Sequence, residues 1–305
     1  MTLRLPQGLV REQLHTVTQS REEYDSTMAT NTLTKHDILT EKEMSDFTLS
    51  PRIFRQIEHF RNKMSLEKSQ MNILDWGCGR GRTVAWLRAQ GYNAFGTDID
   101  AEPVNNCRDL LSGRGLDADS IISLMENGEE RQFPDSFFHL SFSEGVFEHV
   151  KDIEQVAANL KRLTIPGGVG VHFFPAHRHF VEIHLLMPFL HWLPKNKLRK
   201  IYIWLLLSLG KGPKWKELQG KSKAEQAQAY YEYIVHKTYY RAPRTLTDVF
   251  ARNKFRVDFI PLADFGLEKH PVLATLVKFK PLRPLLDWGM RNFGQVGLVI
   301  TRKEH

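Results

Sequence analysis

A glycine-rich turn flanked by carboxylates is the segment with the clearest chemical potential. Residues 73–81 (ILDWGCGRG) end an apolar run and precede a helical pattern. Glycines lack a Cβ atom, so they bend the chain tightly and let a ligand lie against the backbone. The helix that follows offers N–H groups without partners inside the helix. Asp98 ends the next predicted strand, where a carboxylate can accept hydrogen bonds from ribose hydroxyls. The pattern therefore predicts a nucleoside-binding turn.

Four ordered phrases resemble the class I S-adenosylmethionine-dependent methyltransferases of type 11. The spacing G-C-G-x-G after Asp75 resembles motif I of that superfamily and differs from the G-x-G-x-x-G of dinucleotide enzymes. Residues 132–140 (QFPDSFFHL), 143–150 (SEGVFEHV) and 166–168 (PGG) resemble its later phrases. His139 stands where the family usually has aspartate, which we interpret as a tolerated structural change. The resemblance implies a Rossmann-like α/β fold with a seven-stranded sheet.

The resemblance also implies S-adenosyl-L-methionine as cofactor and S-adenosyl-L-homocysteine as product. The loop after Asp75 would hold the methionine part, Asp98 the ribose, and Ile99 would pack on the adenine. Glu126 and Asn127 would face the adenine edge, although a plain polar loop is an equal alternative, and Asp98 has the alternative role of a helix cap. Ser143 and Glu144 would line the floor beside the sulfonium. The predicted cofactor site comprises Asp75, Gly77, Cys78, Gly79, Gly81, Asp98, Ile99, Glu126, Asn127, Ser143 and Glu144.

Histidines supply the candidate catalytic groups. Transfer from a sulfonium mainly requires a nucleophile held close in a dry pocket, but a hydroxyl or amine acceptor must also lose a proton. His149 is one candidate base, with a histidine that only packs at a helix start as the alternative. His177 is the second, and His179 shares its position after the fifth strand. The histidines of residues 172–191 lack the spacing of a zinc motif, so we expect no metal site.

Alternating strands and helices position these residues. Apolar runs predict strands at 72–75, 93–97, 120–124, 140–142 and 170–174. Helical periodicity covers 52–64, 83–90, 101–111 and 153–163, with Ser50 as N-cap and Pro51 at the first helical position. This order is typical of a parallel sheet covered on both faces. Strand patterns return at 255–260 and 296–300. The family resemblance implies that these two strands form an antiparallel pair at the end of the sheet.

The chain divides into four predicted parts. Residues 1–49 form an N-terminal helical arm that is partly disordered, and residues 50–175 form the S-adenosylmethionine-binding core. Residues 176–250 form a helical insertion, rich in aromatic and basic side chains, that serves as a lid or substrate subdomain. A membrane-contacting helix and a subdomain with its own core are the alternatives for this insertion. Residues 251–305 hold the strands that complete the sheet.

Charge is distributed unevenly along the chain. The net charge is +7, with −7 in residues 1–150 (16 basic, 23 acidic) and +14 in residues 151–305 (26 basic, 12 acidic). The basic half suggests an anionic partner, or simply a solvated surface. The two cysteines form no disulfide framework, and no secretory or membrane-spanning pattern is visible. We expect a cytoplasmic protein, with peripheral contact to an anionic membrane as a second expectation.

The expected function is methyl transfer to a small molecule, a sugar or glycan-lipid, or a quinone-like lipid, with oxygen as the favoured acceptor atom. An RNA-directed methyltransferase is the first alternative, but the chain lacks an Asn-Pro-Pro-Tyr motif and a recognisable RNA-binding module. The second alternative is a non-catalytic S-adenosylmethionine-binding protein, because fold and activity are separable. We expect no nucleic-acid partner, and the sequence leaves the oligomeric state open.

Overall fold

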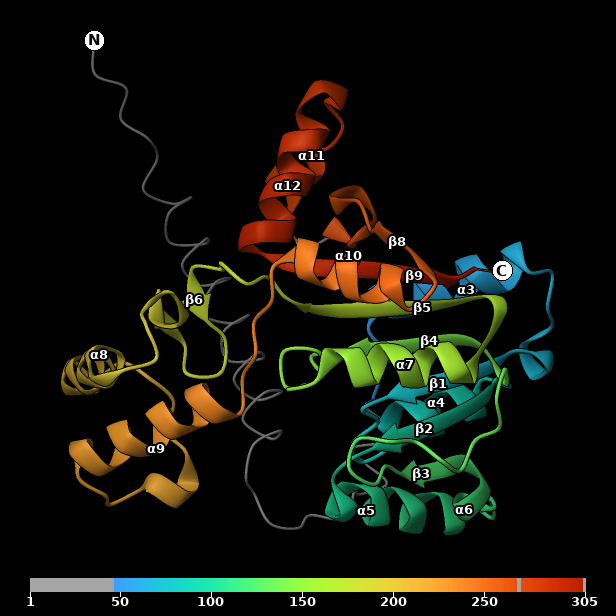
Figure 1. Ribbon diagram of the computed structural model, residues 1–305, viewed down its shortest axis with the longest axis horizontal. Helices are drawn as coiled ribbons and strands as arrows, with labels where there is room; N and C mark the ends of the chain where they lie inside the picture. Colours follow the sequence, from blue (N-terminus) through green and yellow to red (C-terminus); the bar gives the residue numbers. More distant parts are fainter. Residues whose placement is uncertain (1–46, 268–269, 304–305) are drawn as a thin grey trace.

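A seven-stranded sheet organises the protein. The structure is a computed structural model that describes residues 47–267 and 270–303, so most of the predicted N-terminal arm lies outside the described residues. The strand order is β3-β2-β1-β4-β5-β9-β8 (Figure 1). Strands β1 to β5 are parallel, whereas β9 runs antiparallel to both β5 and β8. The α/β fold class and the antiparallel final pair are therefore confirmed.

The strands of this sheet are β1 (Asn72–Trp76), β2 (Asn93–Asp98), β3 (Ile122–Leu124), β4 (Phe138–Glu144), β5 (Thr164–Pro175), β8 (Phe255–Phe259) and β9 (Gln295–Arg302). The α-helices are α3 (Pro51–Lys63), α4 (Arg82–Ala89), α5 (Ala101–Ser112), α6 (Ala118–Ile121), α7 (Ile153–Leu163), α8 (Lys197–Ser208), α9 (Lys223–His236), α10 (Pro243–Arg252), α11 (Pro271–Leu276) and α12 (Arg283–Phe293). Short 3₁₀ turns lie at Lys68–Gln70, Leu190–Trp192, Lys216–Leu218, Leu262–Asp264 and Lys280–Leu282.

Two hydrophobic clusters cover the two faces of the sheet. Successive strand residues point to opposite faces, so Ile73 packs in the cluster that contains the buried side of α3, α4 and α5. Its neighbour Leu74 packs in the other cluster, with α7 and α10. Both faces of the sheet are therefore buried, which explains why its strands are continuous apolar runs in the sequence.

One local prediction was wrong, and another was confirmed in position only. The stretch 120–124 does not form one strand, because residues Ala118–Ile121 form the helical turn α6 and only Ile122–Leu124 pair with β2. Ser50 does stand at the N-cap of α3, with Pro51 next to it, but its side chain makes no capping hydrogen bond. Proline and the apolar face of Ile53, Ile57 and Phe60 therefore define this helix start.

The insertion after β5 has a hydrophobic core of its own. It begins with a short hairpin of β6 (Val181–Glu182) and β7 (Met187–Pro188), and continues into the packed pair α8 and α9. Tyr230 and Ile203 are fully buried in this core. Figure 1 shows α8 and α9 standing apart from the sheet, whereas α10 returns to it beside α7. Within residues 47–267 and 270–303, no helix is both long and apolar enough to cross a bilayer.

Candidate active site

The glycine turn at the end of β1 is shaped by packing at two of its positions and by open space at the third. All three glycines have positive φ: +83° at Gly77, +50° at Gly79 and +72° at Gly81. A Cβ at Gly77 would lie 2.6 Å from Val146 Cγ2, and one at Gly81 would clash with Cys107 Sγ. A Cβ at Gly79 would meet no atom within 4 Å. Packing therefore explains Gly77 and Gly81, while Gly79 leaves backbone accessible to a ligand.

Asp98 closes this turn from the next strand. Its Oδ2 accepts a hydrogen bond from Gly79 N at 2.8 Å, and its Oδ1 accepts one from Asp100 N at 3.1 Å. Burial raises the pKa of Asp98, and these backbone donors oppose the rise. The helix-cap role belongs instead to Asp100, whose side chain accepts from Glu102 N at the start of α5. The carboxylate of Asp98 is thus placed beside the loop rather than used as a cap.

Asp75 lies beneath the same turn. The side chain is buried, and burial together with the charges of Asp98 and Glu144 raises its pKa well above the ordinary value. Such an environment favours a cationic partner, because a positive charge would relieve both the desolvation and the repulsion. The three acids come from the ends of β1, β2 and β4, which meet at one edge of the sheet.

The predicted adenine contacts lie on the exposed side of this edge. Ile99 is 68% exposed, unusual for a large apolar side chain at a strand end. Glu126 and Asn127 are also exposed, in a turn closed by two backbone hydrogen bonds between Glu126 and Glu129. Asn127 has φ +52° and its carbonyl accepts from Gln155 Nε2 at 2.9 Å.

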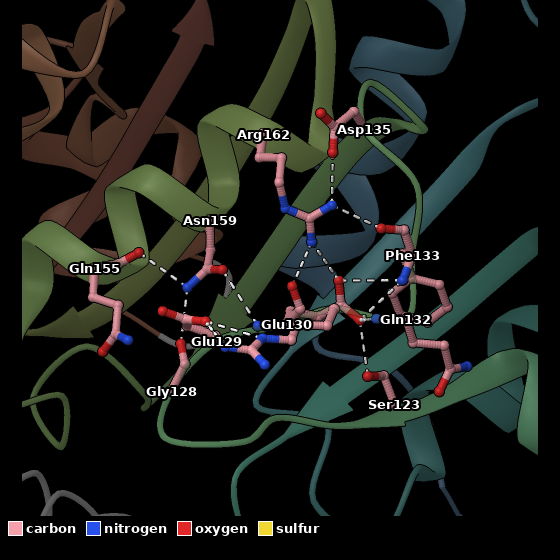
Figure 2. A network of polar contacts seen from close by, with 11 residues as sticks. Ser123, Gly128, Glu129, Glu130, Gln132, Phe133, Asp135, Gln155, Asn159 and Arg162 are labelled. Carbon is pink, nitrogen blue, oxygen red and sulfur yellow. Dashed lines mark hydrogen bonds and ion pairs between the residues drawn. The ribbon is translucent and has the colours of Figure 1, made fainter.

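A buried ion pair holds this turn in place, and sequence reasoning missed it. Figure 2 shows Glu130 next to Gly128 and Glu129 of the turn, with the guanidinium of Arg162 from α7 pointing toward it. The carboxylate of Glu130 accepts from Arg162 Nη2 at 2.9 Å and from Ser123 Oγ at 2.9 Å. It also accepts from the backbone N–H groups of Gln132 and Phe133. A hollow of about 460 Å³ beside this network is lined by none of the predicted cofactor residues.

Ser143 and Glu144 lie at the end of β4, but both have partners. Ser143 is buried, and its Oγ lies 2.9 Å from His172 Nδ1. Glu144 forms an ion pair with Arg52 of α3, which also stacks on Phe173. Burial lowers the pKa of His172 to about 3, so that its ring is neutral and packs against Phe147. Ser143 is therefore engaged between β4 and β5, and Glu144 connects the end of β4 to α3.

His149 has both ring nitrogens engaged. Its Nδ1 lies 2.8 Å from the carbonyl oxygen of Lys237, and its Nε2 lies 3.1 Å from Nε2 of His184. Burial and the neighbouring His184 lower the pKa of His149 to about 4. His184 lies in the insertion, between β6 and β7, and no sequence motif predicted its contact with His149.

His177 follows β5 and is half-buried. Its Nδ1 is buried and has no hydrogen-bond partner among the described residues. Burial and the charge of Arg178 lower the pKa of His177. His179 donates from Nδ1 to the carbonyl oxygen of Ala176, 2.6 Å away, and stacks on His191. Of the two predicted bases, His177 thus has a nitrogen without a protein partner.

His139, the departure from the family phrase, has a structural contact. It lies on β4, and its Nδ1 accepts a hydrogen bond from the backbone N–H of Asn72 at 3.1 Å. Burial lowers the pKa of His139, so the neutral ring can act as the acceptor. The residue connects β4 to the start of β1, away from the carboxyl edge of the sheet.

Known methyltransferases are similar to part of this chain. The ubiquinone biosynthesis O-methyltransferase of Rickettsia prowazekii is 28% identical over 156 residues, which cover 47% of this chain and 60% of that protein. The probable chloroplastic tocopherol O-methyltransferase of Oryza sativa is 33% identical over 103 residues, which cover 33% of this chain and 28% of that protein. The chain thus spans about half the length of the curated relatives it matches.

A solved S-adenosylmethionine-dependent methyltransferase from Mesorhizobium loti is 15% identical and covers 85% of this chain and 100% of that one, with a TM-score of 0.46. Residues 74–171 match the family described as a methyltransferase domain. This match includes the glycine turn, Asp98 and the end of β4. Residues 74–171, about a third of the chain, are therefore similar to this methyltransferase-domain family.

Proposed function

We propose that this protein transfers a methyl group from S-adenosylmethionine to an oxygen atom of a small, quinone-like acceptor. The observation that carries the proposal is the open space at Gly79 beside the Asp98 carboxylate. The methyltransferase-domain match supports the reaction class. The ubiquinone and tocopherol enzymes among the relatives support the acceptor class.

The cofactor would lie along the carboxyl edge of the sheet. Asp75 suits the cationic amino group of the methionine part, because burial and neighbouring acids favour a positive partner there. Asp98 would exchange its bond to Gly79 N for ribose hydroxyls, and Ile99 would bury its exposed side chain under the adenine. When bound, the cofactor supplies a methyl group already activated by a positive sulfur. The protein then mainly orients the acceptor and excludes water.

The acceptor hydroxyl needs a base, and we assign this role to His177 before His149. A base must be neutral and must present a nitrogen lone pair. The depressed pKa of His177 satisfies the first requirement, and its unpartnered Nδ1 the second. His149 would have to release His184 or Lys237 before it could accept a proton.

An apolar acceptor would be collected from a membrane surface by α8. This helix exposes five large apolar side chains along its length: Leu198, Ile201, Trp204, Leu205 and, just after its end, Leu209. Lys197 is exposed at its first turn, and Lys200 lies one turn on. Basic groups beside an exposed apolar face suit an anionic lipid surface. Sedimentation with phosphatidylglycerol vesicles, compared with phosphatidylcholine vesicles, tests this contact. The double variant Leu198→Ser/Leu205→Ser should remove binding without affecting cofactor affinity.

Calorimetry and product analysis test the proposed reaction. Purified protein should bind S-adenosylhomocysteine, and labelled methyl groups from S-adenosylmethionine should appear in a lipid extract as an alkali-stable methyl ether. Binding without transfer to any extract would favour a non-catalytic protein. Label recovered in RNA would favour the RNA-directed alternative. Absence of S-adenosylhomocysteine binding would contradict the proposal as a whole.

A further inference from the structure

A carboxylate and two histidines converge where the insertion meets the core. Glu148 and His149 follow β4, and His184 comes from the turn between β6 and β7. One ligand atom from each residue lies within 4.8 Å of the others. Glu148 and His149 are far from His184 in the sequence, so the spacing of histidines along the chain did not predict this group.

Each histidine makes a contact through its Nδ1 atom that fixes the ring. This leaves the Nε2 atom of His149 facing the Nε2 atom of His184. His149 Nδ1 lies 2.8 Å from Lys237 O, an acceptor only, so this nitrogen carries the proton. His184 Nδ1 lies 2.7 Å from the buried Glu182 carboxylate, which Tyr240 and Leu185 N also contact. Histidines that bind metals typically donate the other ring N–H to a carbonyl or a carboxylate. Both histidines show that arrangement.

The distance between the two Nε2 atoms is that of two ligands on one ion. They lie 3.1 Å apart. Two imidazoles bound at about 2.0–2.1 Å in a tetrahedral site are separated by about 3.3 Å. A hydrogen bond between the rings would give a similar distance, but it requires a second proton on one imidazole.

Glu148 provides an independent indication that this group of residues can bind a cation. The residue is 3% exposed, and its Oε2 is buried without a hydrogen-bond partner among the described residues. A buried carboxylate oxygen normally has a donor or a cation beside it. A side-chain movement of about 1–2 Å would bring the carboxylate to bonding distance from an ion held by both rings.

We infer that Glu148, His149 and His184 form a binding site for a divalent transition-metal ion of the zinc class. Two imidazoles and one carboxylate favour zinc or cobalt over magnesium, which prefers oxygen ligands. Three protein ligands leave a coordination position open for water or another oxygen ligand. The ion would also fasten the insertion to the core, because its ligands come from both parts.

Metal titration of the full chain tests this inference without an activity assay. After chelation and dialysis, the protein is titrated with Co²⁺ and followed by its visible d–d absorption, then with Zn²⁺ in competition. We expect one equivalent per chain, Zn²⁺ displacing Co²⁺, and no displacement by Mg²⁺ at equal concentration. His184→Gln and Glu148→Gln should weaken binding more than about 100-fold, and Glu182→Gln about 10- to 100-fold. The exposed His236, at the end of α9, provides the control His236→Ala, which should bind like the wild type.

Three results would overturn the site: no stoichiometric Co²⁺ binding by the wild type, unchanged affinity in folded His184→Gln, or equal loss in His236→Ala. Circular dichroism establishes whether each variant is folded. If the ligand variants do not fold, X-ray absorption of the wild-type zinc form decides, because the site requires two imidazole ligands. One or no imidazole would refute the assignment. S-adenosylhomocysteine binding is measured on the same samples, so a failure of the metal site remains distinct from a failure of the cofactor site.

Discussion

Replacing Gly79 with alanine separates ligand access from folding. The backbone at Gly79 has φ +50°, which costs an L-residue about 1–2 kcal/mol. The new Cβ meets no protein atom within 4 Å, so no clash adds to that cost. Gly115, in the turn that follows α5, has φ +74° and equally open space. Gly79→Ala and Gly115→Ala should therefore lose similar free energies of unfolding, about 1–2 kcal/mol.

The two variants should differ in cofactor binding. In Gly79→Ala the added methyl would project into the space assigned to the cofactor, and an extra methyl in a packed contact costs about 1–3 kcal/mol. That cost corresponds to about 5- to 150-fold weaker S-adenosylhomocysteine binding. Urea unfolding measures the first quantity, and titration calorimetry the second. Equal affinity of Gly79→Ala and Gly115→Ala would refute the placement of the cofactor against Gly79.

Three other predictions test the remaining parts of the site. Asp98→Asn should weaken S-adenosylhomocysteine binding at least about tenfold, by calorimetry, because a neutral amide accepts ribose hydroxyls less strongly than a carboxylate; unchanged affinity would contradict the ribose role. Glu130→Ala should cost about 1–3 kcal/mol of unfolding free energy, because the buried Ser123 hydroxyl and Phe133 N–H lose their acceptor. Glu129→Ala removes only an exposed ion pair with Arg131 and should cost less than about 1 kcal/mol. Folding lowers the pKa of His172 from 6.5 to about 3. As the pH falls below about 6.5, the unfolded chain therefore binds a proton at this residue while the folded chain does not, and the folded state loses stability. Between about pH 7 and pH 5 the wild type should lose about 2 kcal/mol more than His172→Gln, and parallel pH profiles in urea unfolding would disprove this.

Much of the sheet could be predicted from sequence because each buried strand is a short apolar run followed by a turn signal. The strand at 93–97 and the helix at 153–163 agree closely with β2 and α7. The prediction was wrong at 120–124, where an apolar run alone does not distinguish a strand from one helical turn. Asp117 and Ala118 begin a helix there before the chain extends into β3.

The contacts that sequence could not supply are those between distant segments. The contact between His149 and His184 depends on how the insertion folds back, and the burial of Glu130 depends on Arg162 from α7. Glu144 could be placed at the end of β4, but its pairing with Arg52 depends on how α3 packs. Motif spacing identifies the loops at one edge of the sheet, whereas tertiary packing decides which of their side chains remain available.

The position of β9 has a consequence for how the protein is made. This strand pairs with β5 through Val169 and Thr301, which are far apart in the chain, and separates β5 from β8. While a ribosome is still translating the intervening segment, β5 presents an unpaired edge that invites pairing with other chains. Helices α7 and α10 can pack early, but the hydrogen-bonded edge of β5 waits for residues 295–302. The sheet therefore closes late and slowly, when β9 has emerged, since pairings between segments so distant in the chain form slowly.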